Sequence, residues 1–466
     1  MQYLSVTPDL IKSLKKIVGD IQVIMDAESL EKYAQDETPG YHALPDIVVK
    51  PDCTDDVASI LALANENRIP VTPRSGGTCL SAGAVPIHGG IVLSFERMNR
   101  IKEIDTSNLM VVVEPGVITE QLDKALAEHG LFFPPDPVSL DSCMIGGNIA
   151  ECAGGPRAMK YGVTKQYILG LEIVLADGTI QRYGGKLLKN VTGYNIIDLL
   201  IGSEGTLAII TEATLRVLRR PEVIVDLLVP FESVDQAVGF AIDVLKQGLT
   251  PACIEFMEGD VYRMVAQYLD KKLPFDKADA HIIVEVDGHD KDAVKQLYDR
   301  IGDIALKYGA LDVLVGESIT ERERIWEPRK NASDALKTIE KPIAREDLVV
   351  PKDRIPELIS KIKQCTQKYQ VHMYAFGHLG DGNIHADIGI PKGMDLPTQD
   401  VDALRSEIYR ITIDLGGAIT AEHGIGLSKI KFLELALKND QIELMHNIKR
   451  LFDPRNILNP GKIFHL

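Results

Sequence analysis

Residues 371–390 have the sequence VHMYAFGHLGDGNIHADIGI, in which apolar side chains alternate with others on both sides of a Gly-Asp-Gly-Asn turn. Such alternation predicts two β-strands, and the glycine-rich turn between them predicts a β-hairpin. His378 and His385 lie seven residues apart around this turn. A hairpin can therefore place both imidazoles on one face of adjacent strands.

A third histidine follows in the run Ala421-Glu422-His423-Gly424. Two imidazoles and a carboxylate with open positions suit Zn²⁺, Fe²⁺ or Mn²⁺. We therefore expect His378, His385 and Glu422 to bind a divalent metal, with His423 as a base. A lone histidine is more often structural, but the turn between His378 and His385 favours their convergence.

The chain around this hairpin predicts two main domains. Residues 106–220 mix short apolar strands with helices, and glycine-rich loops separate them. From residue 223 the pattern becomes β-α-β, repeated once, which is typical of a ferredoxin-like antiparallel sheet with helices on it. We expect one domain over residues 1–220, a substrate and cap domain with the metal site over 221–452, and a C-terminal tail over 453–466.

Composition excludes several classes of protein. The 466 residues carry a formal net charge of −16, which argues against a nucleic-acid partner. No apolar run is long enough to span a membrane, and the N-terminus lacks the pattern of a signal peptide. The six cysteines are scattered without a Cys-x-x-Cys pair, so an iron–sulfur cluster or a zinc ribbon is not expected. These features predict a cytoplasmic enzyme with reduced thiols.

Three loops of small residues occur in the first domain: Pro73–Thr78, Met144–Gly155 and Gly202–Thr206. Adjacent glycines allow main chain to approach a phosphate closely and expose N–H donors. The first loop alone is equally consistent with a plain turn, but three such loops fit a large extended cofactor. None has the Gly-x-Gly-x-x-Gly or Walker pattern, which disfavours a Rossmann NAD site.

These loops resemble the FAD-binding domain of the vanillyl-alcohol oxidase and p-cresol methylhydroxylase superfamily. The later motifs are similar to those of the FAD-linked 2-hydroxyacid dehydrogenases, which include D-lactate dehydrogenase, the glycolate oxidase flavin subunit and D-2-hydroxyglutarate dehydrogenase. The segments that carry the resemblance are Pro73–Gly83, Pro134–Gly162, Asn190–Thr206, Gly377–His385, Glu422–Gly424 and Asn459–Lys462. It implies an α+β protein in which a two-subdomain FAD-binding domain is joined to an α+β ferredoxin-like cap.

The resemblance also implies which residues hold FAD. The first loop would bind the pyrophosphate, Ile210 would approach the adenine or ribityl end, and Asn459 would return from the tail to the flavin. The loop lacks the histidine through which some relatives attach flavin, so we expect non-covalent FAD, with Cys79 as a packing residue. The complete expected set is Arg74, Ser75, Gly76, Gly77, Thr78, Gly146, Gly147, Asn148, Ala153, Gly154, Gly162, Glu204, Gly205, Ile210 and Asn459.

Two arginines lie in segments that resemble those supplying substrate-facing basic residues in the family. Arg329 follows Trp326-Glu327-Pro328, and Arg345 begins Arg345-Glu346-Asp347. A guanidinium can bind a carboxylate through two parallel hydrogen bonds, so both are expected to hold the acid group of a substrate. The alternative for each is a surface salt bridge. Asn383 is expected to orient a metal ligand or to contact the substrate.

Together these features predict an FAD-dependent D-2-hydroxyacid dehydrogenase, foremost one that converts D-lactate to pyruvate. Electrons would leave to an external acceptor, with electron-transfer flavoprotein preferred over a quinone, a cytochrome or oxygen. A glycolate oxidase flavin subunit and a D-2-hydroxyglutarate dehydrogenase are the nearest alternatives. An alditol- or cytokinin-oxidase-like enzyme would need no histidine pair, and a catalytically silent electron-transfer subunit would need no metal.

Overall fold

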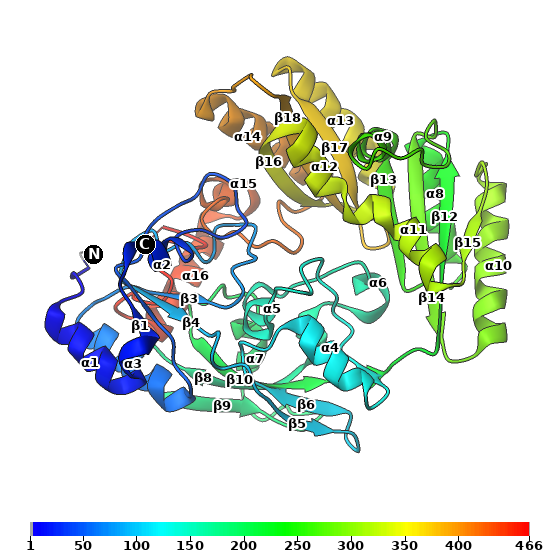
Figure 1. Ribbon diagram of the computed structural model, residues 1–466. Coiled ribbons are helices and arrows are strands. Elements are labelled where there is room, and N and C mark those ends of the chain that lie inside the picture. Colours follow the sequence, from blue (N-terminus) through cyan, green and yellow to red (C-terminus); the bar gives the residue numbers. More distant parts are fainter. Residues whose placement is uncertain (1–2, 466) are drawn as a thin grey trace. The chain divides into compact units, whose positions relative to one another are not determined.

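The computed structural model describes residues 3–465, which fold into two compact units (Figure 1). The first unit takes in the chain up to Gly154, then Val163–Arg220 and the residues from Glu422 onward. The second unit consists of Gly155–Gly162 and Pro221–Ala421. Residues 422–452, which the sequence analysis assigns to the cap domain, thus fold with the first unit.

The first unit contains a mixed four-stranded sheet of order β1-β2-β4-β3 and an antiparallel five-stranded sheet of order β5-β6-β10-β8-β9. The short strands β7 and β11 form a separate two-stranded antiparallel sheet. The strands are β1 (Val23–Ile24), β2 (Ile47–Val49), β3 (Val71–Arg74), β4 (Ile91–Ser94), β5 (Ile101–Asp105), β6 (Met110–Val113), β7 (Leu131–Phe132), β8 (Ile168–Val174), β9 (Ile180–Gly184), β10 (Ile209–Arg216) and β11 (Leu218–Arg219). The helices are α1 (Pro8–Val18), α2 (Ala27–Glu31), α3 (Thr54–Glu66), α4 (Thr119–Ala127), α5 (Ile145–Glu151), α7 (Ile196–Leu200), α15 (Leu433–Ala436) and α16 (Asn439–Phe452).

The C-terminal tail is built into the core of this unit. Helices α1 and α3 bury Leu14 and Ile60 against the strand residues Ile47 and Ile91. The tail residue Leu458 belongs to the same apolar cluster and forms a parallel bridge with the start of β3. This bridge delivers the following residue, the predicted flavin contact, to the strand that leads into the first glycine-rich loop.

The second unit is built on a seven-stranded antiparallel sheet of order β15-β12-β14-β13-β17-β18-β16. Its strands are β12 (Val223–Phe231), β13 (Cys253–Glu258), β14 (Ala280–Gly288), β15 (Leu314–Gly316), β16 (Glu340–Val349), β17 (His372–His378) and β18 (Asn383–Pro391). Its helices are α6 (Ala158–Tyr161), α8 (Val234–Lys246), α9 (Gly259–Tyr268), α10 (Lys291–Lys307), α11 (Ile319–Lys330), α12 (Ala332–Ile339), α13 (Ile355–Lys368) and α14 (Thr398–Asp414). The predicted antiparallel sheet with packed helices is thereby confirmed.

The predicted hairpin is also confirmed, since β17 and β18 pair in register with His378 opposite Asn383 at the turn. Successive side chains of a strand point to opposite faces of the sheet. The face that carries His378 also carries Leu228, Ile283 and Phe376, which pack against α9, α11 and α12. We call this the polar face, because it also carries buried charged and imidazole side chains, among them Asp226, Glu255 and His281.

Candidate active site

His378 and His385 converge on the polar face of the sheet in the second unit. Their Nε2 atoms lie 3.4 Å apart, and their ring planes are nearly perpendicular. Both side chains are buried. Two ring nitrogens that face each other at this distance can share a proton or bind a common cation. The structure therefore confirms that the hairpin brings both imidazoles together.

The other nitrogen of His378 is held by a buried carboxylate. Glu255 on β13 is fully buried, and its Oε1 lies 2.6 Å from Nδ1 of His378. Nε of Arg329 donates to Oε2 of the same carboxylate at 2.9 Å. Burial raises the pKa of Glu255, but the charges of His378 and Arg329 outweigh it and hold that pKa below its usual value. The sequence analysis missed Glu255, although a carboxylate among apolar strand residues was a usable signal.

Asp347 on β16 lies close to Nδ1 of His385 without forming a hydrogen bond to it. Its Oδ1 lies 3.6 Å from Nδ1 of His385 and accepts a hydrogen bond of 2.8 Å from Nδ2 of Asn383. Its Oδ2 accepts from the hydroxyl of Thr420 and from the backbone N–H of Ala421. Asn383 thus supports a carboxylate, and Asp347 fixes the chain directly before Glu422. Asp347 also went unnoticed in the sequence analysis, because nothing in its segment distinguished it from its neighbours.

The two predicted substrate arginines differ in their surroundings. Arg329, at the end of α11, is 6% exposed, and its Nη2 has no hydrogen-bond partner among residues 3–465. Its guanidinium lies 4.9 Å from the centre of the Phe376 ring. Arg345 on β16 forms an ion pair of 3.3 Å with Asp387, its cross-strand neighbour. Each arginine thus pairs with a carboxylate, and Arg329 in addition has a buried donor to offer.

The arrangement around the histidine pair fits a metal site. Metal-binding histidines commonly donate their second ring N–H to a carboxylate, which fixes the tautomer and the ring orientation. Here each Nδ1 has a carboxylate neighbour while the two Nε2 atoms face each other. The donor set of imidazoles with nearby carboxylates suits Zn²⁺, Fe²⁺ or Mn²⁺.

Glu422 and His423, the predicted third ligand and base, belong to the first unit. Oε2 of Glu422 lies so close to Gly154 that a Cβ there would meet it at 2.6 Å. Nε2 of His423 lies 3.9 Å from Oε1 of Glu422. Glu422 thus lies against the second glycine-rich loop, next to a residue predicted to line the cofactor.

The three glycine-rich loops of the first unit meet one another. A Cβ on Gly205 would approach Pro73 to 2.5 Å, and one on Gly146 would approach Oγ of Ser75 to 3.1 Å. Nδ2 of Asn459 donates to the carbonyls of Gly83 and Glu204. Its Oδ1 is buried and has no hydrogen-bond partner among residues 3–465. Main chain without side-chain bulk, together with an unused buried amide oxygen, fits a bound FAD.

Three of the predicted cofactor residues are engaged by the protein itself. The guanidinium of Arg74 donates to the carbonyls of Gln35 and Lys32. Asn148 donates to the hydroxyl of Thr119 at 2.7 Å. Both carboxylate oxygens of Glu204 accept backbone N–H groups. These side chains support the loops that we expect to hold FAD.

The remaining predicted cofactor residues fall in different kinds of structure. Gly162 ends the short segment Gly155–Gly162, which folds with the second unit. Ile210 lies on β10, paired with Ile173 of β8. Gly147 lies in helix α5, which takes up much of the second predicted loop. The others lie in loops as predicted: Gly76, Gly77, Thr78, Ala153 and Gly154.

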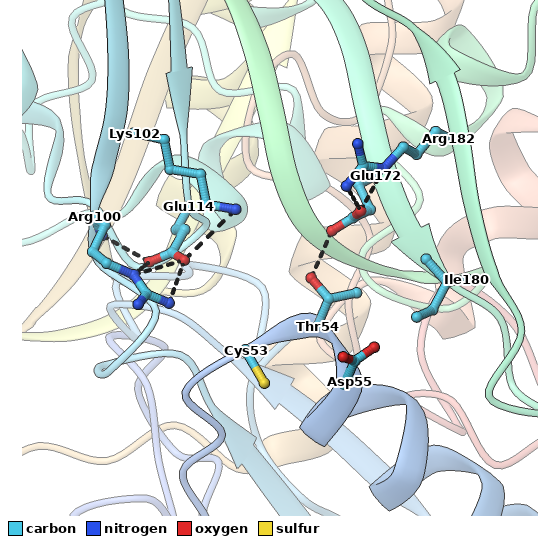
Figure 2. A pocket seen from close by; sticks show the side chains of 9 residues that line it. All are labelled: Cys53, Thr54, Asp55, Arg100, Lys102, Glu114, Glu172, Ile180 and Arg182. Carbon is cyan, nitrogen blue, oxygen red and sulfur yellow. Dashed lines mark hydrogen bonds and ion pairs between the residues drawn. The ribbon is translucent and has the colours of Figure 1, made fainter.

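A separate pocket of about 390 Å³ in the first unit contains none of the predicted site residues (Figure 2). Two of its carboxylates are engaged in ion pairs: Glu114 with Arg100 and Lys102, and Glu172 with Arg182. We therefore do not assign the reaction to it.

Comparisons with known proteins agree with this geometry. A family model described as "FAD linked oxidases, C-terminal domain" matches residues 220–463, and one described as "FAD binding domain" matches residues 45–184. The chain belongs to the FAD-linked oxidases. The glycolate oxidase subunit GlcD of Bacillus subtilis is 40% identical over 93% of this chain and 92% of its own length. D-lactate dehydrogenases of Archaeoglobus fulgidus (38% identical, 93% of this chain and 95% of that protein) and Anaerostipes hadrus (34%, 99% and 98%) are also similar.

Solved structures show the same fold at lower sequence identity. p-Cresol methylhydroxylase with bound substrate superposes with a TM-score of 0.80, at 19% identity, over 98% of this chain and 96% of that one. The predicted α+β fold of the p-cresol methylhydroxylase type is thereby confirmed, and the family establishes an FAD-linked oxidoreductase. Within residues 3–465, the structure has no helix with the length and apolar character needed to cross a membrane.

Proposed function

We propose that this FAD-linked oxidoreductase is a D-2-hydroxyacid dehydrogenase that oxidises D-lactate to pyruvate. The observation that carries the proposal is the buried pair His378 and His385, whose Nε2 atoms lie 3.4 Å apart while each Nδ1 has a carboxylate neighbour. An oxidase that needed only flavin would gain nothing from this pair. The similarity to D-lactate dehydrogenases supports the choice of substrate class.

His378, His385 and Glu422 are the residues that would hold a divalent metal. A metal bound there supplies a Lewis acid that binds the hydroxyl and carboxylate oxygens of the substrate and lowers the hydroxyl pKa. Glu255 keeps the imidazole of His378 oriented through its Nδ1 atom, which leaves Nε2 for the metal, and the carboxylate of Asp347 lies close to Nδ1 of His385.

Arg329 would fix the substrate carboxylate. Its Nη2 is buried and lacks a hydrogen-bond partner in the described part of the chain, so a carboxylate bound there would restore a hydrogen bond lost on burial. Its Nε is hydrogen-bonded to Glu255, and its guanidinium group packs over the ring of Phe376. The guanidinium is therefore already oriented before a substrate binds. We assign Arg345 a secondary part in the same recognition, because Asp387 competes for it.

His423 would take the proton of the substrate hydroxyl on its imidazole. FAD held by the cofactor loops would supply a hydride acceptor for the substrate Cα, and loss of one proton and one hydride converts lactate to pyruvate. We further propose an external electron acceptor, foremost electron-transfer flavoprotein. The scattered cysteines support an external acceptor, since the sequence lacks a Cys-x-x-Cys pair for an internal cluster.

A glycolate oxidase flavin subunit is the second candidate, favoured by the 40% identity to GlcD of Bacillus subtilis. Glycolate and D-lactate share the 2-hydroxy carboxylate that this site would bind. They differ by one methyl group, which a hydrophobic contact distinguishes by roughly 10–200-fold.

An anaerobic titration of the purified flavoprotein tests the proposal. The flavin absorption band is followed while D-lactate, L-lactate, glycolate and D-2-hydroxyglutarate are added in separate experiments. Rapid bleaching by D-lactate, lost after chelator treatment and restored by metal, is the expected result. Faster bleaching by glycolate would favour the second candidate, and a band that none of the four acids bleaches would contradict both.

A further inference from the structure

The segment Glu422–Ser428, which we call the base loop, carries the proposed base and third ligand without regular secondary structure. A base acts efficiently only when it is held within a fraction of an ångström of its proton. Because residues 422–428 form no helix or strand, they lack the regular backbone hydrogen bonds of such an element. Other groups of the first unit supply several hydrogen bonds to this backbone instead.

Glu204 supplies two of these bonds. Its Oε1 accepts the N–H of Ile425 at 2.8 Å, and its Oε2 accepts the N–H of Gly426 at 2.7 Å. Glu204 is itself fixed, because its N–H donates to the carbonyl of Ala150 and its carbonyl accepts from Asn459. A buried carboxylate with two backbone donors is a strong, oriented acceptor.

Two further anchors hold the later part of the base loop. The carbonyl of Ser81 accepts the N–H groups of Leu427 and Ser428, and Ile463 donates to the carbonyl of Gly426. Of these three anchors, Glu204 holds the residue nearest to His423 along the chain. Glu204 therefore controls the part of the loop whose position decides where the imidazole lies.

Gly424, which directly follows His423, passes between two carboxyl groups. Its φ of +76° suits glycine, and a Cβ would lie 2.5 Å from Oε2 of Glu151 and 2.8 Å from Oε1 of Glu204. Burial and the neighbouring charge of Glu204 raise the pKa of Glu151 well above its usual value. The pKa of Glu204 is raised to about 7, because the effect of burial exceeds the lowering by the two amides and by the nearby Lys429 and Lys462. Glu204 is the carboxyl that accepts the two amides of the loop.

We propose that Glu204 is a positioning residue that sets the place of His423 by holding the amides of Ile425 and Gly426. This inference rests on the proposed function for the role of His423. It also replaces the expectation that Glu204 contacts the cofactor, because both of its carboxylate oxygens are already directed at the base loop.

The test compares Glu204→Gln with Glu151→Gln, which makes the same change on a neighbouring buried carboxyl that holds neither amide. In Glu204→Gln one amide loses its acceptor, because the glutamine NH₂ group would face it. We expect hydrogen exchange in a peptide spanning the base loop to accelerate at least about tenfold, one such factor per 1.4 kcal/mol. The turnover number should fall by roughly 10–100-fold at unchanged KM and FAD content. Glu151→Gln should change none of these.

A second variant guards against misfolding of the first. Gly424→Ala leaves Glu204 intact but forces the loop away from both carboxyl groups, so it should show the same faster exchange and lower turnover with FAD still bound. Exchange and turnover in Glu204→Gln that match those of Glu151→Gln would overturn the proposal. So would a loss of activity that follows loss of FAD, since that indicates a cofactor contact. If the wild-type protein oxidises no 2-hydroxy acid, the proposed function fails, while the exchange comparison still decides whether Glu204 holds the loop.

Discussion

The cofactor loops of the first unit and the polar face of the second unit are built on opposite principles. In the loops, main chain forms the expected binding surface, and charged side chains such as Arg74 and Glu204 hold the backbone in place. On the polar face, side chains form the site, and other side chains orient them, as Glu255 does for His378. A charged residue in a motif of the first unit is therefore expected to support the backbone, whereas one on the polar face is expected to belong to the site or to orient its side chains.

The largest expected effect separates the two regions directly. His385→Ala removes one of the two facing imidazoles, so flavin reduction by D-lactate should fall by about 10³-fold or more, since a bound metal supplies several kcal/mol. FAD content should be unchanged, because no cofactor loop is touched. Stopped-flow absorbance and the flavin-to-protein ratio measure both quantities.

His372→Ala is the matched control for this experiment. His372 lies on the same face of β17 but near its start, where it is bonded to Glu340 and half exposed. Its removal should leave flavin reduction within about twofold of wild type, as expected for a surface position. Equal losses of flavin reduction in the two variants would contradict the assignment of His385 to the active site.

Glu255→Gln probes the support of the polar face. The side-chain oxygen of glutamine can accept a hydrogen bond from either His378 or Arg329, but its NH₂ group then faces the other residue. Because His378 would be less firmly oriented, we expect metal affinity to drop by about 10–100-fold. Glu258→Gln is a close control, because Glu258 is a buried carboxylate of the same strand, paired with Lys363, on the opposite face of the sheet. Competition with a chelating dye reports the affinity, and a similar drop in both variants would argue for a general effect of buried charge.

The two arginines should differ in the size of their effects. Arg329→Lys removes a planar, preoriented donor, and the catalytic efficiency with D-lactate should fall about 10–100-fold, mainly through KM, as expected for a hydrogen bond to a charged group. Arg345→Lys should have a smaller effect, because the side chain of Arg345 is 20% exposed, against 7% for Arg329. Steady-state kinetics with an artificial electron acceptor decide the order, and a larger loss for Arg345→Lys would reverse our assignment.

The smallest effect concerns the stability of the first unit. The pKa of Glu151 is raised well above 4.5 by burial and by the charge of Glu204. Above pH 4.5 the unfolded chain releases this proton while the folded protein keeps it, so folding is penalised increasingly as pH rises. Glu151→Gln should therefore raise the midpoint of thermal unfolding at pH 8, with a gain that shrinks toward pH 5. A gain independent of pH would contradict the assignment of this proton.

Much of the fold and part of the site could be predicted from the sequence. The strand period and the turn predicted the β17–β18 hairpin, because local patterning determines a hairpin with a short loop. The glycine-rich loops were recognisable because adjacent glycines are uncommon in a sequence and stand out in its composition. Both signals are local in sequence, which is why they could be found.

The supporting residues could not be found in the same way. Glu255 meets His378, and Asp347 meets Ala421, across long stretches of chain, and only the strand order of the sheet brings them together. The role of Glu204 was hidden for the opposite reason. Its motif suggested a cofactor contact, but its carboxylate turns to a loop more than two hundred residues away in sequence.

The most direct test of the central claim is a titration of the metal-free protein with Zn²⁺ or Mn²⁺ by calorimetry, in wild type and in the variant with both His378→Ala and His385→Ala. The account predicts one ion per chain in the wild type and none in the double variant, with FAD content equal in both. Equal binding in the two proteins, or no binding in the wild type, would contradict the claim that the histidine pair of the polar face is a metal site.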